Sequence, residues 1–179
     1  MKIFKYISII LLSLVALVLV SALFIKNEFA VERQIEIHKP NAQVFNFLRF
    51  LKSQDEFSVW ALTDSNMEKS MSGKDGMVGA ISRWKSNNKD IGTGEQEIIG
   101  IVENKQVDLE LRFKEPFESK DHAYFLTEAQ GDSSTIVKWG FDGRMDYPMN
   151  FMLPIIGMEN ELGGMLQTGL DKLKIVLEK

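Results

Sequence analysis

The sequence predicts an α+β fold in which a curved antiparallel β-sheet wraps around one long C-terminal α-helix, preceded by one N-terminal transmembrane helix. Three features of the sequence support this. An uncharged apolar run occupies residues 7–25, short segments of alternating apolar and polar residues fill the middle of the chain, and apolar residues recur at helical spacing after Met158. Because every strand has one apolar face and only one large helix can cover these faces, the sheet must curve around that helix.

The composition is that of an ordinary folded protein with few routes to metal or thiol chemistry. Of the 179 residues, 45% are hydrophobic and 26% are charged, which suits one domain of common size. The chain has no cysteine, which excludes disulfides and thiol nucleophiles, and its only histidines are His38 and His122. A net charge of −4 argues against nucleic-acid partners. We therefore expect no metal, no cofactor and no nucleic acid.

The apolar run of residues 7–25 is long enough to cross a membrane. At a rise of 1.5 Å per residue, the twenty uncharged residues from Tyr6 to Ile25 span about 30 Å, the thickness of a bilayer core. A core helix would show a polar face and a signal peptide has a shorter apolar stretch, so we favour an uncleaved anchor at residues 1–26. Lys2 and Lys5 then hold the N-terminus in the cytoplasm, and residues 27–179 form an extracytoplasmic domain. Secretion after cleavage at Val20-Ser21-Ala22 is the alternative.

Alternation of apolar and polar residues predicts the strands of the sheet. The clearest is 106–113, where Val107, Leu109, Leu111 and Phe113 alternate with polar residues. Further strands are expected at 31–38, 67–72, 80–85, 94–102, 121–129 and 135–142, separated by turns rich in Gly, Asn, Asp and Ser. Residues 42–51 show helical spacing, and residues 55–60 are expected to form a second short helix. The short connections favour antiparallel pairing.

The end of the chain predicts one long helix. From Met158 onward apolar residues recur every three or four positions for about five turns. Gly163, Gly164 and Gly169 interrupt this pattern, and each costs about 1 kcal/mol relative to alanine in a helix interior. Either close packing against the sheet or room for a ligand between helix and sheet would account for them.

Several short motifs give residues 27–179 a resemblance to a known superfamily. They are Pro40 with Val44-Phe45, Phe57-Ser58-Val59-Trp60, Gly73 to Gly79, Trp84, Gly92-Thr93-Gly94, Phe113 to Phe117, Val137 to Phe141 and Gly169 to Lys174. These residues resemble the polyketide cyclase/dehydrase and lipid-transport superfamily, and within it the bacterial membrane-anchored SRPBCC proteins. The resemblance implies the START-like helix-grip fold, with a cavity between the concave face of the sheet and the C-terminal helix. It says less about function, because the superfamily holds lipid carriers, receptors and enzymes.

Strand parity and helix spacing then predict the residues that line this cavity. They are Trp84, Gln96, Leu109, Leu111, Phe113, Phe125, Trp139 and Phe141 on the strands, and Met158, Leu162, Met165 and Leu166 on the helix. Trp139 and Met165 are expected to face each other across the cavity. The alternative is that these residues form an ordinary packed core. Methionine supports a binding site, because its flexible thioether adapts to apolar guests of different shapes.

Polar residues near the predicted cavity distinguish binding from catalysis. Gln96 is expected on the cavity side, His122 and Tyr124 on the outer face, and residues 144–147 in a loop at the mouth. Because no set of ionisable side chains is expected to converge inside, we predict a monomeric, membrane-anchored domain that binds a hydrophobic small molecule or lipid. A cyclase- or dehydrase-like enzyme acting in the same cavity, or a non-catalytic interaction module, is the alternative.

Overall fold

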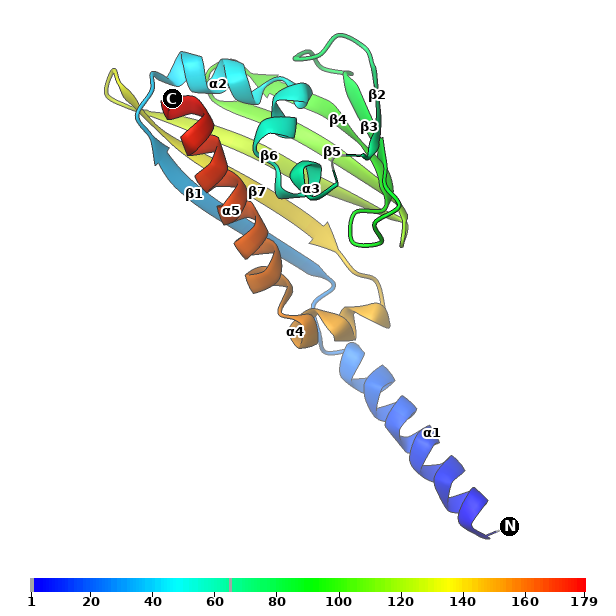
Figure 1. Cartoon of the computed structure of the whole chain (residues 1–179). Coiled ribbons are helices and arrows are strands. Elements are labelled where there is room, and N and C mark those ends of the chain that lie inside the picture. Colours follow the sequence, from blue (N-terminus) through cyan, green and yellow to red (C-terminus); the bar gives the residue numbers. More distant parts are fainter. Residues whose placement is uncertain (1, 65) are drawn as a thin grey trace.

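The computed structural model describes residues 2–64 and 66–179 and confirms the predicted α+β architecture. Helix α1 (Lys2–Ala22) projects from one end of a domain in which a curved sheet surrounds helix α5 (Met158–Glu178), as Figure 1 shows. Helix α2 (Asn41–Leu48) and helix α3 (Val59–Thr63) lie on the same side of the sheet as α5. The three helices together cover the concave face of the sheet.

Within the described residues the strands form one seven-stranded antiparallel sheet, in the order β1-β7-β6-β5-β4-β3-β2. They are β1 (Glu28–Ile37), β2 (Glu68–Ser72), β3 (Ile81–Lys85), β4 (Thr93–Val102), β5 (Gln106–Glu115), β6 (Ser119–Gln130) and β7 (Ser134–Arg144). Every predicted strand is present, and β4 to β7 are longer than predicted. Because β1 pairs with β7, the first and last strands lie side by side at one edge.

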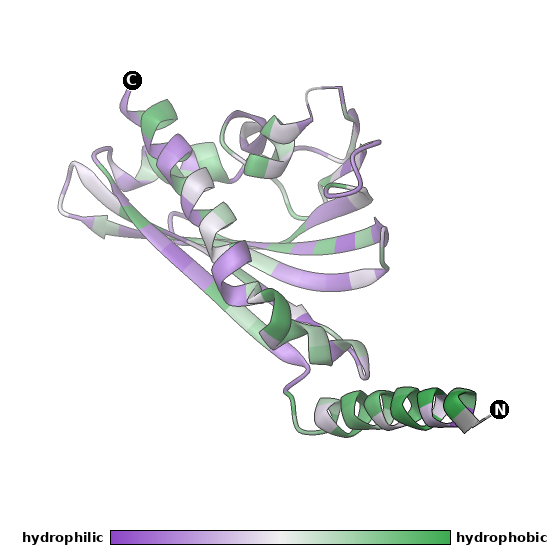
Figure 2. Ribbon diagram, turned by 60° about the horizontal axis from the view of Figure 1, so that its bottom comes forward, coloured by the Kyte–Doolittle hydropathy of each residue, from purple (hydrophilic) through white to green (hydrophobic). Residues whose placement is uncertain are grey.

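The core lies between α5 and the concave face of the sheet. Leu166, Leu170 and Leu173 of α5 are fully buried, and so is Val137 of β7. These leucines follow the spacing of three or four residues that places them on one side of a helix. Figure 2 shows apolar and polar residues alternating along the strands, as expected when one face is buried and the other meets water.

Close packing accounts for two of the three glycines in α5. A Cβ atom on Gly169 would lie 2.6 Å from Cζ3 of Trp139, and a Cβ atom on Gly163 would collide with the guanidinium group of Arg33. Gly164 is different, because a Cβ atom there would meet no atom within 4 Å among the described residues. The glycines at 163 and 169 therefore let β1 and β7 approach the helix closely.

The short helices depart from the prediction. Instead of a helix at 55–60, a 3-10 helix, η1 (Leu51–Glu56), follows α2 directly and precedes α3. The carboxylate of Asp75 accepts hydrogen bonds from the backbone N–H groups of Leu51 and Lys52, at 2.8 and 3.2 Å, and so fixes the start of η1. Phe57 is fully buried after η1, which separates η1 from α3.

Helix α1 is long and apolar enough to span a membrane or to serve as a signal sequence. Its C-terminal end lies against η2 (Met149–Phe151), which leads through α4 (Met152–Ile156) into α5. The side-chain NH2 group of the buried Asn150 lies 2.7 to 2.8 Å from the carbonyl oxygens of Ala22 and Ile25 and from Oδ1 of Asn27, so its two N–H donors are shared among three acceptors. This one amide group therefore joins the end of α1 to the domain.

Candidate functional site

A cavity of about 960 Å³ lies between the concave face of the sheet and the helices. Strands β3 to β7 supply its floor, α5 supplies one wall, and η1 and α3 supply another. The wall residues from η1 and α3 are Gln54, Asp55, Trp60 and Ala61, together with Ser58 at the start of α3. The volume lies within the range of about 300–1,000 Å³ that small-molecule pockets occupy.

Most of the residues predicted to line the cavity do line it. They are Trp84, Gln96, Leu109, Leu111, Phe113, Trp139, Phe141, Met158, Leu162 and Leu166. Ala123 of β6 completes the floor between β5 and β7. Ligand binding by these residues stays a prediction.

Two predicted residues lie elsewhere. Phe125 has the inward parity expected of it, but it is covered by Phe57 and Trp139, whose ring centroids are 6.0 and 5.0 Å away, so it belongs to the core. Met165 is 39% exposed on the outer side of α5 and does not reach the cavity. A helix turns by about 100° per residue, so Met165 points well away from its neighbour Leu166. Trp139 therefore faces Gly169 and not Met165.

Two pairs of aromatic rings line the cavity. Trp139 and Trp60 meet edge to face with centroids 6.0 Å apart, and Trp84 and Phe113 do the same at 5.7 Å. The Nε1–H group of Trp84 donates to the carbonyl oxygen of Ile91, so the polar end of this ring is satisfied within the protein. The ring faces of these aromatic side chains are apolar and suit an apolar guest.

A few uncharged polar groups border the cavity. Gln96 of β4 pairs in register with Ser82 of β3, and both side chains line the floor. Gln54 is buried at the wall, and its Nε2 atom finds no hydrogen-bond acceptor among residues 2–64 and 66–179. Ser82 lies two residues before Trp84 on the same strand, so strand parity could have predicted that it faces the cavity. Gln54 could not be predicted in this way, because it lies in η1, whose position the sequence did not predict.

Charged groups gather at the exposed border of the cavity. Lys69 and Asp55 form an ion pair at 2.7 Å, and Arg144 contacts Asp146 at 2.7 Å. The carboxylate of Asp146 raises the pKa of the Arg144 guanidinium group. Of the charged residues that line the cavity only Asp121 is half-buried, and its carboxylate accepts hydrogen bonds from the Ser119 hydroxyl and the Arg144 backbone N–H. Residues 144–147 border the cavity, as predicted.

The remaining titratable groups of interest lie on the outer, convex face of the sheet. His122 contacts Asp108 and Asp142 at 3.1 and 3.2 Å, and the Tyr124 hydroxyl donates to Glu32 at 2.7 Å. Burial and the Glu32 carboxylate raise the pKa of Tyr124. These side chains point away from the cavity, as their strand positions predicted, and so cannot act on a guest inside it.

Nearby on the convex face, one guanidinium group joins three carboxylates. Arg112 contacts Glu95, Glu97 and Glu110 at 2.6 to 2.8 Å. Hydrogen bonding from Arg112 lowers the pKa of Glu95, and hydrogen bonds from Lys120 and Arg112 lower the pKa of Glu110. The three carboxylates come from β4 and β5, so this network fastens two neighbouring strands on the side opposite the cavity.

Solved structures share this arrangement, although their sequences differ greatly. The Aha1 dimer from Colwellia psychrerythraea is 16% identical, with a TM-score of 0.57 over 84% of this chain and 96% of that one. Norcoclaurine synthase from Thalictrum flavum, solved with dopamine and hydroxybenzaldehyde, is 11% identical, with a TM-score of 0.60 over 84% and 87% of the two chains. A Chromobacterium violaceum protein is 12% identical, with a TM-score of 0.58 over 84% and 97%.

The fold is the helix-grip fold. No protein-family profile matches the sequence, and no curated protein sequence does either. At these identities the likeness to solved structures establishes the architecture and not the activity.

Proposed function

We propose that this protein is a membrane-anchored domain that binds a hydrophobic small molecule or lipid in the cavity between the sheet and α5. The observation that carries the proposal is the lining of that cavity. Aliphatic and aromatic side chains of β5, β7 and α5 form its apolar walls, and Gln96, Ser82 and Gln54 add uncharged polar groups. The charged residues of the lining lie at the border of the cavity and, apart from Asp121, are exposed. Such a combination of apolar walls and few polar groups is typical of small-molecule sites.

An enzyme acting in the same cavity has less support. General acid–base catalysis needs an ionisable group within hydrogen-bond distance of the reacting atoms. The charged residues that line the cavity are exposed at its border, apart from Asp121, which is bonded within the protein. Apolar walls without such groups favour binding.

The anchor is proposed to be α1, uncleaved, with the N-terminus in the cytoplasm and residues 27–179 outside it. A hydrogen bond from the buried Asn150 to the carbonyl oxygen of Ala22 supports retention of the helix. Cleavage after Ala22 would remove that residue and with it this bond. A reporter that is active only in the cytoplasm, fused after Lys179, should stay inactive. A mature chain beginning near Leu23 would refute the anchor.

We propose further that the domain is monomeric. Three of the 21 basic residues and none of the 25 acidic residues lie before Asn27, so residues 27–179 carry a net charge of −7 that opposes self-association. Light scattering of the full chain in detergent micelles should give the mass of one chain per micelle, and two chains per micelle would contradict this.

A pair of tryptophan substitutions tests the site. Leu162 lines the cavity, so L162W should fill part of it, whereas Met165 points outward and M165W should not. We expect the full chain in detergent micelles to bind a fluorescent fatty acid, with roughly tenfold weaker binding in L162W and unchanged binding in M165W. Circular dichroism checks that both variants are folded.

Equal binding by the two folded variants would contradict the proposed location of the guest. An absence of binding in the parent chain would contradict the proposed guest class. Native mass spectrometry of protein extracted from its own membrane then identifies what the cavity holds.

A further inference from the structure

Exposed apolar side chains gather at the end of the domain from which α1 leaves. Phe117 comes from the loop between β5 and β6, and the others come from the segment between β7 and α5. We call this set the apolar rim: Phe117, Tyr147, Met149, Met152, Ile155 and Ile156. Phe117 is 76% exposed and Ile155 is 60% exposed. Exposed apolar residues in such a group mark a surface that meets a partner.

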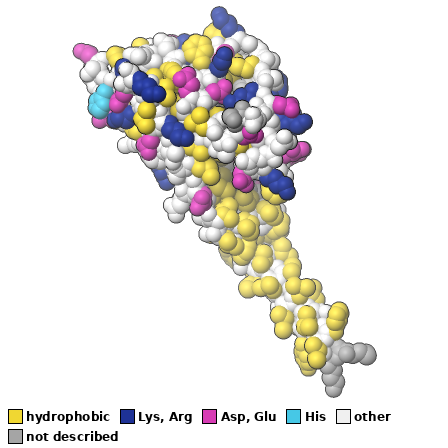
Figure 3. Space-filling view, in the orientation of Figure 1, with side chains coloured by type: hydrophobic (Ala, Val, Ile, Leu, Met, Phe, Trp, Pro, Cys, Tyr) yellow, Lys and Arg dark blue, Asp and Glu magenta, His cyan; other side chains and the backbone are white. Residues whose placement is uncertain are grey.

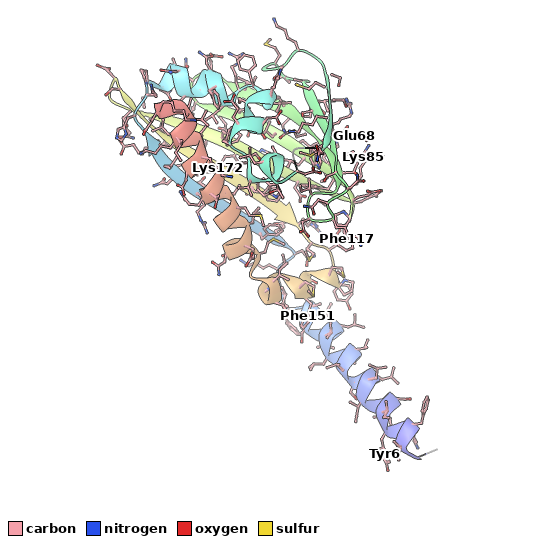
Figure 4. All side chains as sticks on the ribbon, viewed as in Figure 1. Tyr6, Glu68, Lys85, Phe117, Phe151 and Lys172 are labelled. Carbon is pink, nitrogen blue, oxygen red and sulfur yellow. The ribbon has the colours of Figure 1, made fainter. Side chains whose placement is uncertain are left out.

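The apolar rim borders the cavity. Phe117, Tyr147 and Met149 line the cavity and are also exposed to the outside. In Figure 4 the labelled side chain of Phe117 lies at the end of the domain nearest α1, and Phe151 lies at the junction with α1 itself. A guest that enters or leaves the cavity at this border therefore passes apolar side chains.

The apolar rim is held next to the end of α1. Asn150 lies between Met149 and Phe151 in η2, and its amide group donates to the Ala22 and Ile25 carbonyls. These bonds place η2 and α4 level with the last turn of α1. Figure 3 shows the apolar surface of α1 continuing onto this end of the domain.

We propose that the apolar rim lies in the interfacial layer of the bilayer that holds α1, and that the cavity exchanges its guest directly with that bilayer. This rests on the proposed function, in which α1 is a membrane anchor and the guest is apolar. A helix that crosses the bilayer and ends at Ala22 brings its bonded neighbour η2 to the membrane surface. Apolar and aromatic side chains at that level enter the boundary between headgroups and acyl chains.

The charge of the domain indicates how this contact is made. Residues 27–179 carry a net charge of −7, so attraction to anionic headgroups cannot supply the contact. Burial of apolar side chains supplies it instead, and we expect it in bilayers of neutral phosphatidylcholine.

Site-specific labelling of the full chain in phosphatidylcholine nanodiscs tests the position of the apolar rim. The chain has no cysteine, so one introduced cysteine carries a single environment-sensitive fluorophore. Suitable sites are F117C and I155C, with D132C in the turn between β6 and β7 as the control at the far end of the domain. We expect spin-labelled phosphatidylcholine to quench the first two labels and to leave the third unchanged. The proposal would be overturned if the labels at 117 and 155 were quenched as little as the label at 132. It would also be overturned if a second copy of the chain, and not lipid, shielded those two labels.

A second measurement tests exchange. The double variant M152S/I155S changes two residues of the apolar rim that do not line the cavity. It should release a fluorescent fatty acid into the bilayer about tenfold more slowly than the parent, with unchanged affinity at equilibrium. The matched control is I175S, which removes an exposed apolar side chain from α5 outside the apolar rim. Equal exchange rates in the two variants would overturn the exchange step. An absence of fatty-acid binding in every variant would refute the proposed function, whereas binding without quenching at 117 and 155 would refute only the position of the apolar rim.

Discussion

Replacing Gly164 by alanine and replacing Gly169 by alanine should change the stability of the protein in opposite directions, although both glycines belong to α5. Both substitutions add one methyl group and remove the same backbone freedom. What differs is the space beside each Cα atom. A Cβ atom on Gly164 meets no atom within 4 Å among the described residues, whereas a Cβ atom on Gly169 would lie 2.6 Å from Cζ3 of Trp139.

The expected magnitudes follow from these contacts. G164A should stabilise the protein by about 1 kcal/mol, the difference in helix propensity between glycine and alanine. At Gly169 the same gain is opposed by overpacking of about 1–3 kcal/mol, so G169A should destabilise by up to about 2 kcal/mol. The ring of Trp139 cannot easily retreat, because Phe57 and Phe125 lie against it with centroids 5.5 and 5.0 Å away.

Thermal unfolding of the full chain in detergent micelles, followed by near-ultraviolet circular dichroism, measures both effects. One kcal/mol corresponds to about 2–4 °C in Tm for a domain of this size. G163A is an intermediate case, because its Cβ atom meets the movable end of the Arg33 side chain and not a rigid ring. If G169A raised Tm as much as G164A does, the close packing of α5 on β7 described here would be wrong.

Two further predictions concern polar groups. R112M should destabilise the protein more at pH 7 than at pH 3, as urea unfolding of parent and variant at both pH values would show. The lowered pKa values of Glu95 and Glu110 mean that their contribution is fully present above the unfolded value of 4.5 and is lost as the pH falls through the native values. An equal difference at the two pH values would contradict this assignment. Q54M should raise Tm, because it removes a buried N–H group that has no acceptor among the described residues, a defect of about 1–3 kcal/mol. A lower Tm for Q54M would contradict the assignment of the Gln54 N–H group as unsatisfied.

The strands and α5 could be predicted because their patterns are local. Alternation in 106–113 and the helical recurrence of Leu162, Leu166 and Leu170 arise from residues close together in the sequence. The resemblance to helix-grip proteins added the cavity, and parity then located most of its floor. The antiparallel pairing and the curvature of the sheet agree with that expectation.

The errors come from contacts between distant parts of the chain. The position of η1 depends on Asp75, which lies more than twenty residues beyond the amide groups that it binds. Phe125 has inward parity but lies under Phe57, which no strand pattern could indicate. Met165 fell outside because the buried stripe of α5 is narrower than the apolar pattern in the sequence. The apolar rim does not follow the period of a helix or a strand in the sequence, because its members come from two loops and from the two short helices η2 and α4.

The two edges of the sheet would affect how copies of this protein meet if α1 anchors them in a membrane, as proposed above. A chain confined to a surface encounters its neighbours often, and an open strand edge invites them to pair. Here β2 is one edge, with only five exposed residues that include Glu68 and Lys69. The other edge, β1, is longer, but side chains occupy two of its carbonyl oxygens: Arg33 donates to that of Glu32, and Lys174 donates to that of Glu36, both at 2.8 Å. An incoming strand would have to displace both bonds, so the sheet resists growth at the edge where growth would otherwise be easiest.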